Sequence, residues 1–119
     1  MKRLGIFGST GSIGTQTLEI VRDFPNDLEV TVLAAGRNSV LLEQQIREFH
    51  PKMVCIFDEK AYSDLKSRTS DIAGLKIVTG MDGLLACATE DCFDTMVAAM
   101  VGMIGIRPTI AAIRAGKEI

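Results

Sequence analysis

The sequence predicts a doubly wound α/β domain, in which a mainly parallel β-sheet carries helices on both faces. Short apolar runs alternate five times with longer helical patterns, as they do in right-handed βαβ units. The apolar runs are nearly continuous, which is typical of strands buried on both faces. A glycine-rich turn separates the first apolar run from the first helical pattern. This turn is the third observation that predicts the fold.

The expected strands are the apolar, often β-branched runs that end at a glycine or a polar turn: residues 4–7, 29–35, 53–57, 75–79 and 95–101. The expected helices place apolar residues three or four positions apart: residues 12–24, 39–49, 59–67, 81–89 and a last helix that ends at Gly116. Together these segments form five strand–helix units in one domain.

Residues that start or stop helices set the expected boundaries. Ser39 is expected to be the N-cap of the second helix, and His50 its end, because a following proline biases a residue away from helical dihedrals. Pro108 is expected in the first turn of the last helix, and Gly116 at the C′ position after it. The last three residues, 117–119, look like the entry to a sixth strand, so the domain is expected to be truncated.

The composition of the chain limits the classes of function that it can have. The 119 residues are 47% apolar and 24% charged, with a formal net charge of −2, which predicts a single domain over residues 1–119 and no nucleic-acid partner. The sequence has neither an apolar stretch long enough for a membrane span nor a secretory signal, so we expect a cytoplasmic protein without a membrane partner. Cys55, Cys87 and Cys92 are expected to be buried or half-buried thiols, since a zinc site would need more ligands.

The most informative segment is residues 8–14, Gly-Ser-Thr-Gly-Ser-Ile-Gly, between the first strand and the first helix. Glycine lets a backbone turn sharply and approach a pyrophosphate, and the N–H groups at a helix start attract anions. The spacing is one residue longer than the G-x-G-x-x-G fingerprint. Thr10 and Ser12 add hydroxyl groups, although Ser12 could equally be only the helix N-cap. We therefore predict a dinucleotide phosphate site in a Rossmann-like domain, with a ligand-free tight turn as the alternative.

The end of the second strand indicates which dinucleotide is bound. An NAD-binding domain usually places an acidic residue here, on the ribose diol, but residues 34–38 contain no carboxylate. Arg37 can pair with a 2′-phosphate and stack on adenine, and Asn38 and Ser39 offer donors nearby. The prediction is NADP(H); the alternative is an exposed arginine in a turn.

Two further segments are weaker indicators. Residues 98–105 are small and apolar and leave room for a nicotinamide and its ribose, but the same composition suits helix–sheet packing. Tyr62 and Lys66 match the catalytic pair of short-chain dehydrogenases, yet they follow the third strand on a charged helix. We expect them to form a solvated helix face, and we expect His50 to be a cap or surface residue.

In combination these motifs resemble the N-terminal portion of the 1-deoxy-D-xylulose 5-phosphate reductoisomerase family. The resemblance covers the whole chain in order, through residues 8–14, 35–38, 101–109 and 111–117. It implies that seven residues bind NADPH, the first four at the pyrophosphate side and the last three at the 2′-phosphate end: Thr10, Gly11, Ser12, Ile13, Gly36, Arg37 and Asn38.

The resemblance further implies the activity of a longer, homodimeric protein. That protein would convert 1-deoxy-D-xylulose 5-phosphate, a phosphosugar, to 2-C-methyl-D-erythritol 4-phosphate in the non-mevalonate isoprenoid pathway, using NADPH and a divalent metal, Mg or Mn. The family's metal ligands and catalytic segments follow position 119, so no residue of this chain is expected to be catalytic and the fragment alone is expected to be inactive. Two alternatives stay open: the NADPH-binding domain of another oxidoreductase, such as a semialdehyde dehydrogenase, or a non-catalytic dinucleotide-sensing module.

Overall fold

The computed structural model describes residues 1–100 and 102–119. At its centre lies a five-stranded sheet in the order β4-β3-β2-β1-β5, in which every neighbouring pair is parallel. The strands are β1 (Lys2–Phe7), β2 (Leu28–Ala35), β3 (Met53–Ile56), β4 (Lys76–Thr79) and β5 (Thr95–Ala98). The helices are α1 (Ser12–Asp23), α2 (Ser39–Phe49), α3 (Glu59–Arg68), α4 (Gly80–Ala88) and α5 (Met103–Arg114).

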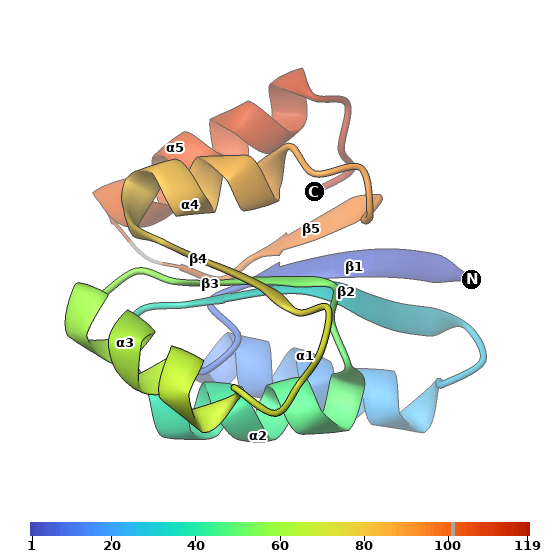
Figure 1. Ribbon diagram of the computed structural model, residues 1–119. Coiled ribbons are helices and arrows are strands. Elements are labelled where there is room, and N and C mark those ends of the chain that lie inside the picture. Colours follow the sequence, from blue (N-terminus) through green and yellow to red (C-terminus); the bar gives the residue numbers. More distant parts are fainter. Residues whose placement is uncertain (101) are drawn as a thin grey trace.

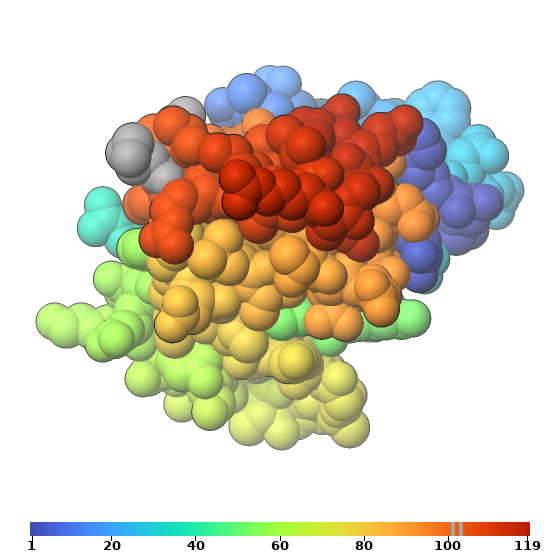
Figure 2. Space-filling model, turned by 90° about the horizontal axis from the view of Figure 1, so that it is seen from above, coloured from blue at the N-terminus to red at the C-terminus, as the bar shows by residue number. Residues whose placement is uncertain are grey.

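Helices cover both faces of the sheet, which confirms the doubly wound prediction. Helices α1, α2 and α3 lie on one face, and α4 and α5 on the other (Figure 1). Figure 2 looks onto this second face, where α4 and α5 lie side by side. The chain adds β2, β3 and β4 outward from β1 and then returns through α4 to place β5 on the opposite side of β1. The carboxyl ends of β1 and β5 therefore form the topological switch point, where open α/β sheets bind their ligands.

Buried apolar side chains form one cluster on each face of the sheet. Ile6 and Phe7 are adjacent in β1 and point into different clusters, because successive strand residues face opposite sides. The first cluster includes one fully buried leucine from each covering helix: Leu18, Leu42 and Leu65. In the second, the rings of Phe7 and Phe93 lie with their centroids 6.1 Å apart. Burial on both faces explains why the strands are nearly continuous apolar runs.

Most element boundaries lie within one or two residues of the expected ones, but the N-cap of α2 was wrong. Asn38 is the N-cap, and its side chain accepts a hydrogen bond from the N–H of Leu41 at 3.1 Å. Ser39 is instead the first helical residue. Asn and Ser are both good N-caps, and Asn38 takes the role because its oxygen reaches the N–H three residues ahead. His50 ends the helix as expected, with a left-handed φ of 52°.

Two expectations near the carboxyl-terminal helix were also wrong. Strand β5 ends at Ala98 rather than at Val101, and Val101 itself lies outside the described residues. Pro108 lies inside α5 rather than in its first turn, because the helix begins at Met103. The chain can start the helix this early because Gly102 takes φ +73°, a turn that side-chain-bearing residues rarely make.

The end of the chain behaves as expected. Gly116 has φ +84° after α5, and the N–H groups of Gly116 and Lys117 donate to the last carbonyl groups of the helix, as in a Schellman motif. Glu118 then pairs in parallel with Thr95 at the outer edge of β5. Its N–H donates to the carbonyl oxygen of Asp94 at 3.0 Å. The expected entry to a sixth strand is present as this single bridge.

Candidate dinucleotide-binding site

The glycine-rich segment forms the turn from β1 into α1 at the switch point. Gly8 has φ +104°, and a Cβ there would lie 2.6 Å from the carbonyl carbon of Ala99, which follows β5. Gly14 lies in the first turn of α1, where a Cβ would lie 2.0 Å from the carbonyl oxygen of Gly8. A Cβ on Gly11 would meet only that same oxygen, at 3.6 Å. The first and third glycines are therefore required by packing, whereas the middle one leaves the turn open.

Helix α1 begins without a side-chain cap. Gly11 is its N-cap, and in the described part of the chain no side chain bonds to the helix start, nor is there an acidic residue in the first turn. Ser12 is thus the first helical residue and not the N-cap. The N–H groups of the first helical residues, Ser12 and Ile13 among them, have no partner inside the helix, and both residues are exposed. With the helix dipole, these N–H groups favour an anion.

The two candidate loops lie at the same edge of the sheet. Strands β1 and β2 are neighbours, with Phe7 opposite Ala34. The N–H groups of Gly8 and Ser9 both donate to the carbonyl oxygen of Ala34, at 2.8 and 3.0 Å. The loop of residues 36–38 begins two positions after Ala34 in the sequence. The structure therefore brings Thr10, Gly11, Ser12 and Ile13 beside Gly36, Arg37 and Asn38.

Arg37 is exposed at this edge. Within residues 1–100 and 102–119 its guanidinium pairs with no carboxylate, whereas four other arginines do: Arg3, Arg22, Arg47 and Arg68. Before it, Gly36 is open, since a Cβ there would meet nothing within 4 Å. The loop therefore presents a free cation on an accessible backbone, as a phosphate site requires.

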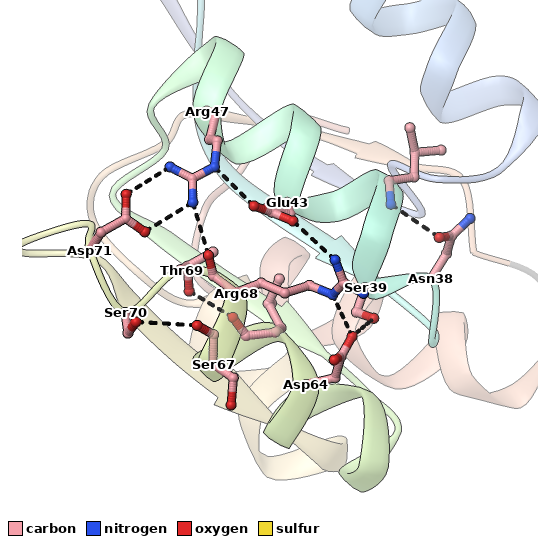
Figure 3. Close-up of polar contacts among 12 residues, drawn as sticks. Asn38, Ser39, Glu43, Arg47, Asp64, Ser67, Arg68, Thr69, Ser70 and Asp71 are labelled. Atoms are coloured by element: carbon pink, nitrogen blue, oxygen red, sulfur yellow. Dashed lines mark hydrogen bonds and ion pairs between the residues drawn. The ribbon is translucent and has the colours of Figure 1, made fainter.

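Ser39 is not a free donor, contrary to the sequence interpretation. Its hydroxyl donates to Oδ2 of Asp64 on α3 at 2.5 Å, as Figure 3 shows. The same carboxylate oxygen accepts from Nε of Arg68 at 2.7 Å. The Ser39 hydrogen bond, followed by that of Arg68, lowers the pKa of Asp64. Ser39 therefore fixes the start of α2 onto α3 instead of facing a ligand.

A chain of ion pairs extends this contact along α2 and α3 (Figure 3). Arg47 donates to both oxygens of Asp71, at 2.9 and 3.0 Å, and to Oε2 of Glu43 at 3.0 Å. It also reaches the carbonyl oxygen of Arg68 at 2.9 Å. Arg47 and Asp71 are exposed and Glu43 is half-buried, so each pair adds little stability. Together they fix the position of α2, whose first residues border the site.

Sequence reasoning missed one buried polar contact behind the glycine turn. Gln45 on α2 is only 4% exposed, and its Nε2 donates to the carbonyl oxygen of Ser9 at 2.9 Å. Among the described residues, the Oγ of Ser9 and the Oε1 of Gln45 are buried without a hydrogen-bond partner. The helical spacing indicated only that Gln45 would be buried, because it lies three positions after Leu42, and it did not indicate the partner.

The remaining sequence predictions fall outside this site. A Cβ on Gly105 would lie 2.4 Å from the carbonyl oxygen of Met100, so close packing accounts for this glycine, and a nicotinamide position over residues 98–105 stays a prediction. Lys66 is exposed, as expected for a solvated face, and its Nζ lies 5.2 Å from the centroid of the Tyr62 ring. For Tyr62 the expectation was wrong, because its ring is half-buried and packs against the core cluster. His50 is an exposed helix cap, also as expected.

The cysteines are free thiols: Cys55 and Cys87 are buried and Cys92 is half-buried, as expected. The hydrogen bond with Cys55, together with burial, raises the pKa of the Cys87 thiol, which makes it unreactive. The described residues contain no group of three or more His, Cys, Asp or Glu arranged to hold a metal ion. None of their helices has both the length and the apolarity needed to cross a membrane.

A parallel doubly wound sheet with a glycine turn and an uncapped helix at its switch point defines a Rossmann-like domain of the dinucleotide-binding class. The family model described as 1-deoxy-D-xylulose 5-phosphate reductoisomerase matches residues 4–119. The chain belongs to the 1-deoxy-D-xylulose 5-phosphate reductoisomerase family. This match decides against a semialdehyde dehydrogenase.

Relatives in this family are similar over the whole chain. The reductoisomerase of Lachnoclostridium phytofermentans is 56% identical over 119 residues, and that of Desulfitobacterium hafniense (strain DSM 10664 / DCB-2) is 52% identical over 119 residues. The chain is covered completely in both comparisons, but it spans only 30% and 31% of the relatives' own lengths. It therefore corresponds to about one third of those proteins.

Solved structures agree with the fold. A DOX-P reductoisomerase in complex with NADPH, fosmidomycin and magnesium matches with a TM-score of 0.92 and 36% identity, over 98% of this chain and 29% of that one. The Zymomonas mobilis reductoisomerase in complex with NADPH matches with a TM-score of 0.89 and 32% identity, over 98% of this chain and 30% of that one. The Rossmann-like fold expected from the sequence is confirmed.

Proposed function

We propose that residues 1–119 are the NADPH-binding portion of a longer reductoisomerase that converts 1-deoxy-D-xylulose 5-phosphate to 2-C-methyl-D-erythritol 4-phosphate in the non-mevalonate isoprenoid pathway. The observation that carries the cofactor assignment is Arg37, which pairs with no carboxylate among the described residues and lies next to a helix start that lacks a side-chain cap in that same part of the chain. A neutral or acidic dinucleotide loop would favour NADH, whereas a free guanidinium favours a 2′-phosphate. The similarity to a structure in complex with NADPH supports the same cofactor.

In this proposal the glycine turn binds the pyrophosphate. The open N–H groups of Ser12 and Ile13 donate to phosphate oxygens, and Gly11 allows the phosphates to approach the backbone closely. Thr10, which is half-buried, places its hydroxyl group on the same edge. NADPH supplies the hydride when it is bound, and the residues of this chain orient it.

The loop after β2 holds the 2′-phosphate end of the cofactor. Arg37 pairs with the phosphate, and Gly36 keeps the backbone accessible beside it. Asn38 already accepts the N–H of Leu41 with its Oδ1, so the side-chain NH₂ group is the part that donates toward the phosphate. This division of roles lets one residue both cap α2 and contact the ligand.

The substrate, metal and assembly belong to the longer protein. We propose a phosphosugar substrate, a divalent Mg or Mn ion with ligands outside residues 1–119, and a homodimer in the cytoplasm. Free buried thiols fit a reducing compartment. The net charge of −2 does not favour binding to nucleic acid. Exposed Ile106, Ile110 and Ile113 on α5 are apolar surface that the rest of the protein or a second copy would cover.

An assay of the full-length protein tests the proposed activity. Consumption of NADPH should depend on both 1-deoxy-D-xylulose 5-phosphate and Mg²⁺ or Mn²⁺. Residues 1–119 alone should show no turnover, because none of them is assigned a catalytic role. Turnover by residues 1–119, or full-length protein that never consumes NADPH with this substrate, would contradict the proposal. Light scattering of the full-length protein tests the homodimer.

A further inference from the structure

We propose that Gln45 is a positioning residue that fixes the phosphate-binding turn from behind, a role that rests on the proposed function. Its Nε2 donates to the carbonyl oxygen of Ser9 at 2.9 Å, across 36 positions of sequence. Ser9 is fully buried and directly precedes Thr10, the first residue proposed to contact the pyrophosphate. Gln45 holds the turn through the main chain and does not touch the cofactor itself.

The contact combines a gain and a cost in stability. Gln45 lies on the buried face of α2, where Leu42 and Ile46 are apolar. Its Oε1 and the Oγ of Ser9 are both buried without a hydrogen-bond partner in the described residues. Burying such groups is costly: an apolar side chain of the same length would avoid the orphaned amide oxygen, but it would leave the carbonyl oxygen of Ser9 without its donor. A half-satisfied amide at this place points to a positional role for its one hydrogen bond.

The same helix links the two parts of the site. Asn38 caps α2 beside Arg37, and Gln45 holds the glycine turn seven positions later on the same rigid element. Ser39 fixes the start of this helix onto Asp64. Helix α2 is therefore a second link between the pyrophosphate and the 2′-phosphate subsites, beside the hydrogen bonds from Gly8 and Ser9 to the carbonyl oxygen of Ala34. Loss of the Gln45 bond should loosen the turn at Ser9 and Thr10 and leave the Arg37 loop in place.

The test compares two ligands in the full-length protein. NADP⁺ spans both subsites, whereas 2′-AMP carries a 2′-phosphate but no pyrophosphate. Gln45→Met keeps the length of the side chain and removes the donor. Gln44→Met is the matched control, since Gln44 is the neighbouring residue on α2 and is exposed. Affinities are measured by isothermal titration, with the melting temperature as the check on folding.

Gln45→Met should weaken NADP⁺ binding by about fivefold to tenfold, the worth of one hydrogen bond, and change 2′-AMP binding by less than about twofold. Gln44→Met should change neither. Unchanged NADP⁺ binding in Gln45→Met, or an equal loss for both ligands, overturns the proposal. If Gln45→Met does not fold, Gln45→Asn replaces it, because its amide is one methylene too short to reach the carbonyl oxygen of Ser9. This variant must likewise weaken NADP⁺ binding and leave 2′-AMP binding nearly unchanged. Wild-type protein that does not bind NADP⁺ contradicts the proposed function instead.

Discussion

A Cβ on Gly14 would lie 2.0 Å from the carbonyl oxygen of Gly8 and 2.6 Å from the Cα of Ser9. The first turn of α1 thus rests directly on the end of β1, and a methyl group does not fit between them. This close approach aims the N–H groups at the start of α1 toward the switch point. The shape of the glycine-rich turn depends on this close approach.

Gly14→Ala should therefore damage both folding and cofactor binding. Overpacking against backbone atoms, which cannot rotate away, should lower the free energy of unfolding by about 3 kcal/mol. Urea denaturation measures the loss, and titration with NADPH should show weakened binding in the folded fraction. Gly11→Ala is the control, since its Cβ would be 3.6 Å from the same oxygen and should cost less than about 1 kcal/mol. Equal stability losses in the two variants would contradict the packing argument.

The sequence predicted the fold well because its signals are local. Glycines at 8 and 14, nearly continuous apolar strands and three-to-four helical spacing each reflect one physical requirement, and the structure satisfies all of them. The position of Arg37 at the end of the second strand was also readable, since β2 ends at Ala35. The sequence pattern alone therefore predicted that the two loops of the candidate site lie at the same edge of the sheet.

The missed features depend on which side chains meet in space. Nothing local distinguishes Asn38 from Ser39 as a cap, and the choice follows from Asp64 on α3, which binds the Ser39 hydroxyl. Gln45 likewise shows its role only when α2 packs beside the Ser9 carbonyl group. Such pairings join positions 25 and 36 residues apart, and a single sequence does not reveal them.

Lys117 should stabilise the end of the domain more than a surface lysine does. Its Nζ donates to the carbonyl oxygens of Glu90 and Phe93, both at 2.7 Å, and lies 4.4 Å from the centroid of the Phe93 ring. Lys117→Met removes both bonds and should lower the free energy of unfolding by about 1–3 kcal/mol. Lys60→Met, at an exposed position of α3, should stay within about 0.5 kcal/mol. Chemical denaturation of both variants measures the change in the free energy of unfolding. Equal losses in the two variants would refute the role of Lys117.

Acid should destabilise the domain through its ion pairs. Hydrogen bonds from Ser39 and Arg68 lower the pKa of Asp64, and those from Arg47 lower the pKa of Asp71. A lowered folded-state pKa stabilises the fold above the unfolded value of about 3.9, and this contribution is lost as the pH falls through the folded value.

The melting temperature should accordingly fall as the pH is lowered from about 5 to about 2. Asp64→Asn should reduce the slope of this fall, since the variant has no carboxyl group to protonate at that position. High salt should also reduce it, because the pairs are exposed. A melting temperature that does not change over this range, or a variant whose slope matches the wild type, would argue against the ion-pair account.

The central claim, that Arg37 selects a 2′-phosphate beside the glycine turn, is tested most directly by isothermal titration of the full-length protein with NADPH and NADH at one fixed salt concentration. Wild-type protein should prefer NADPH by about 10- to 100-fold, the worth of one charged hydrogen-bonded pair. Arg37→Glu should abolish this preference, whereas Arg114→Glu, at the exposed end of α5, should retain it. Equal affinity of the wild type for both cofactors, or a preference that survives in Arg37→Glu, would contradict the account.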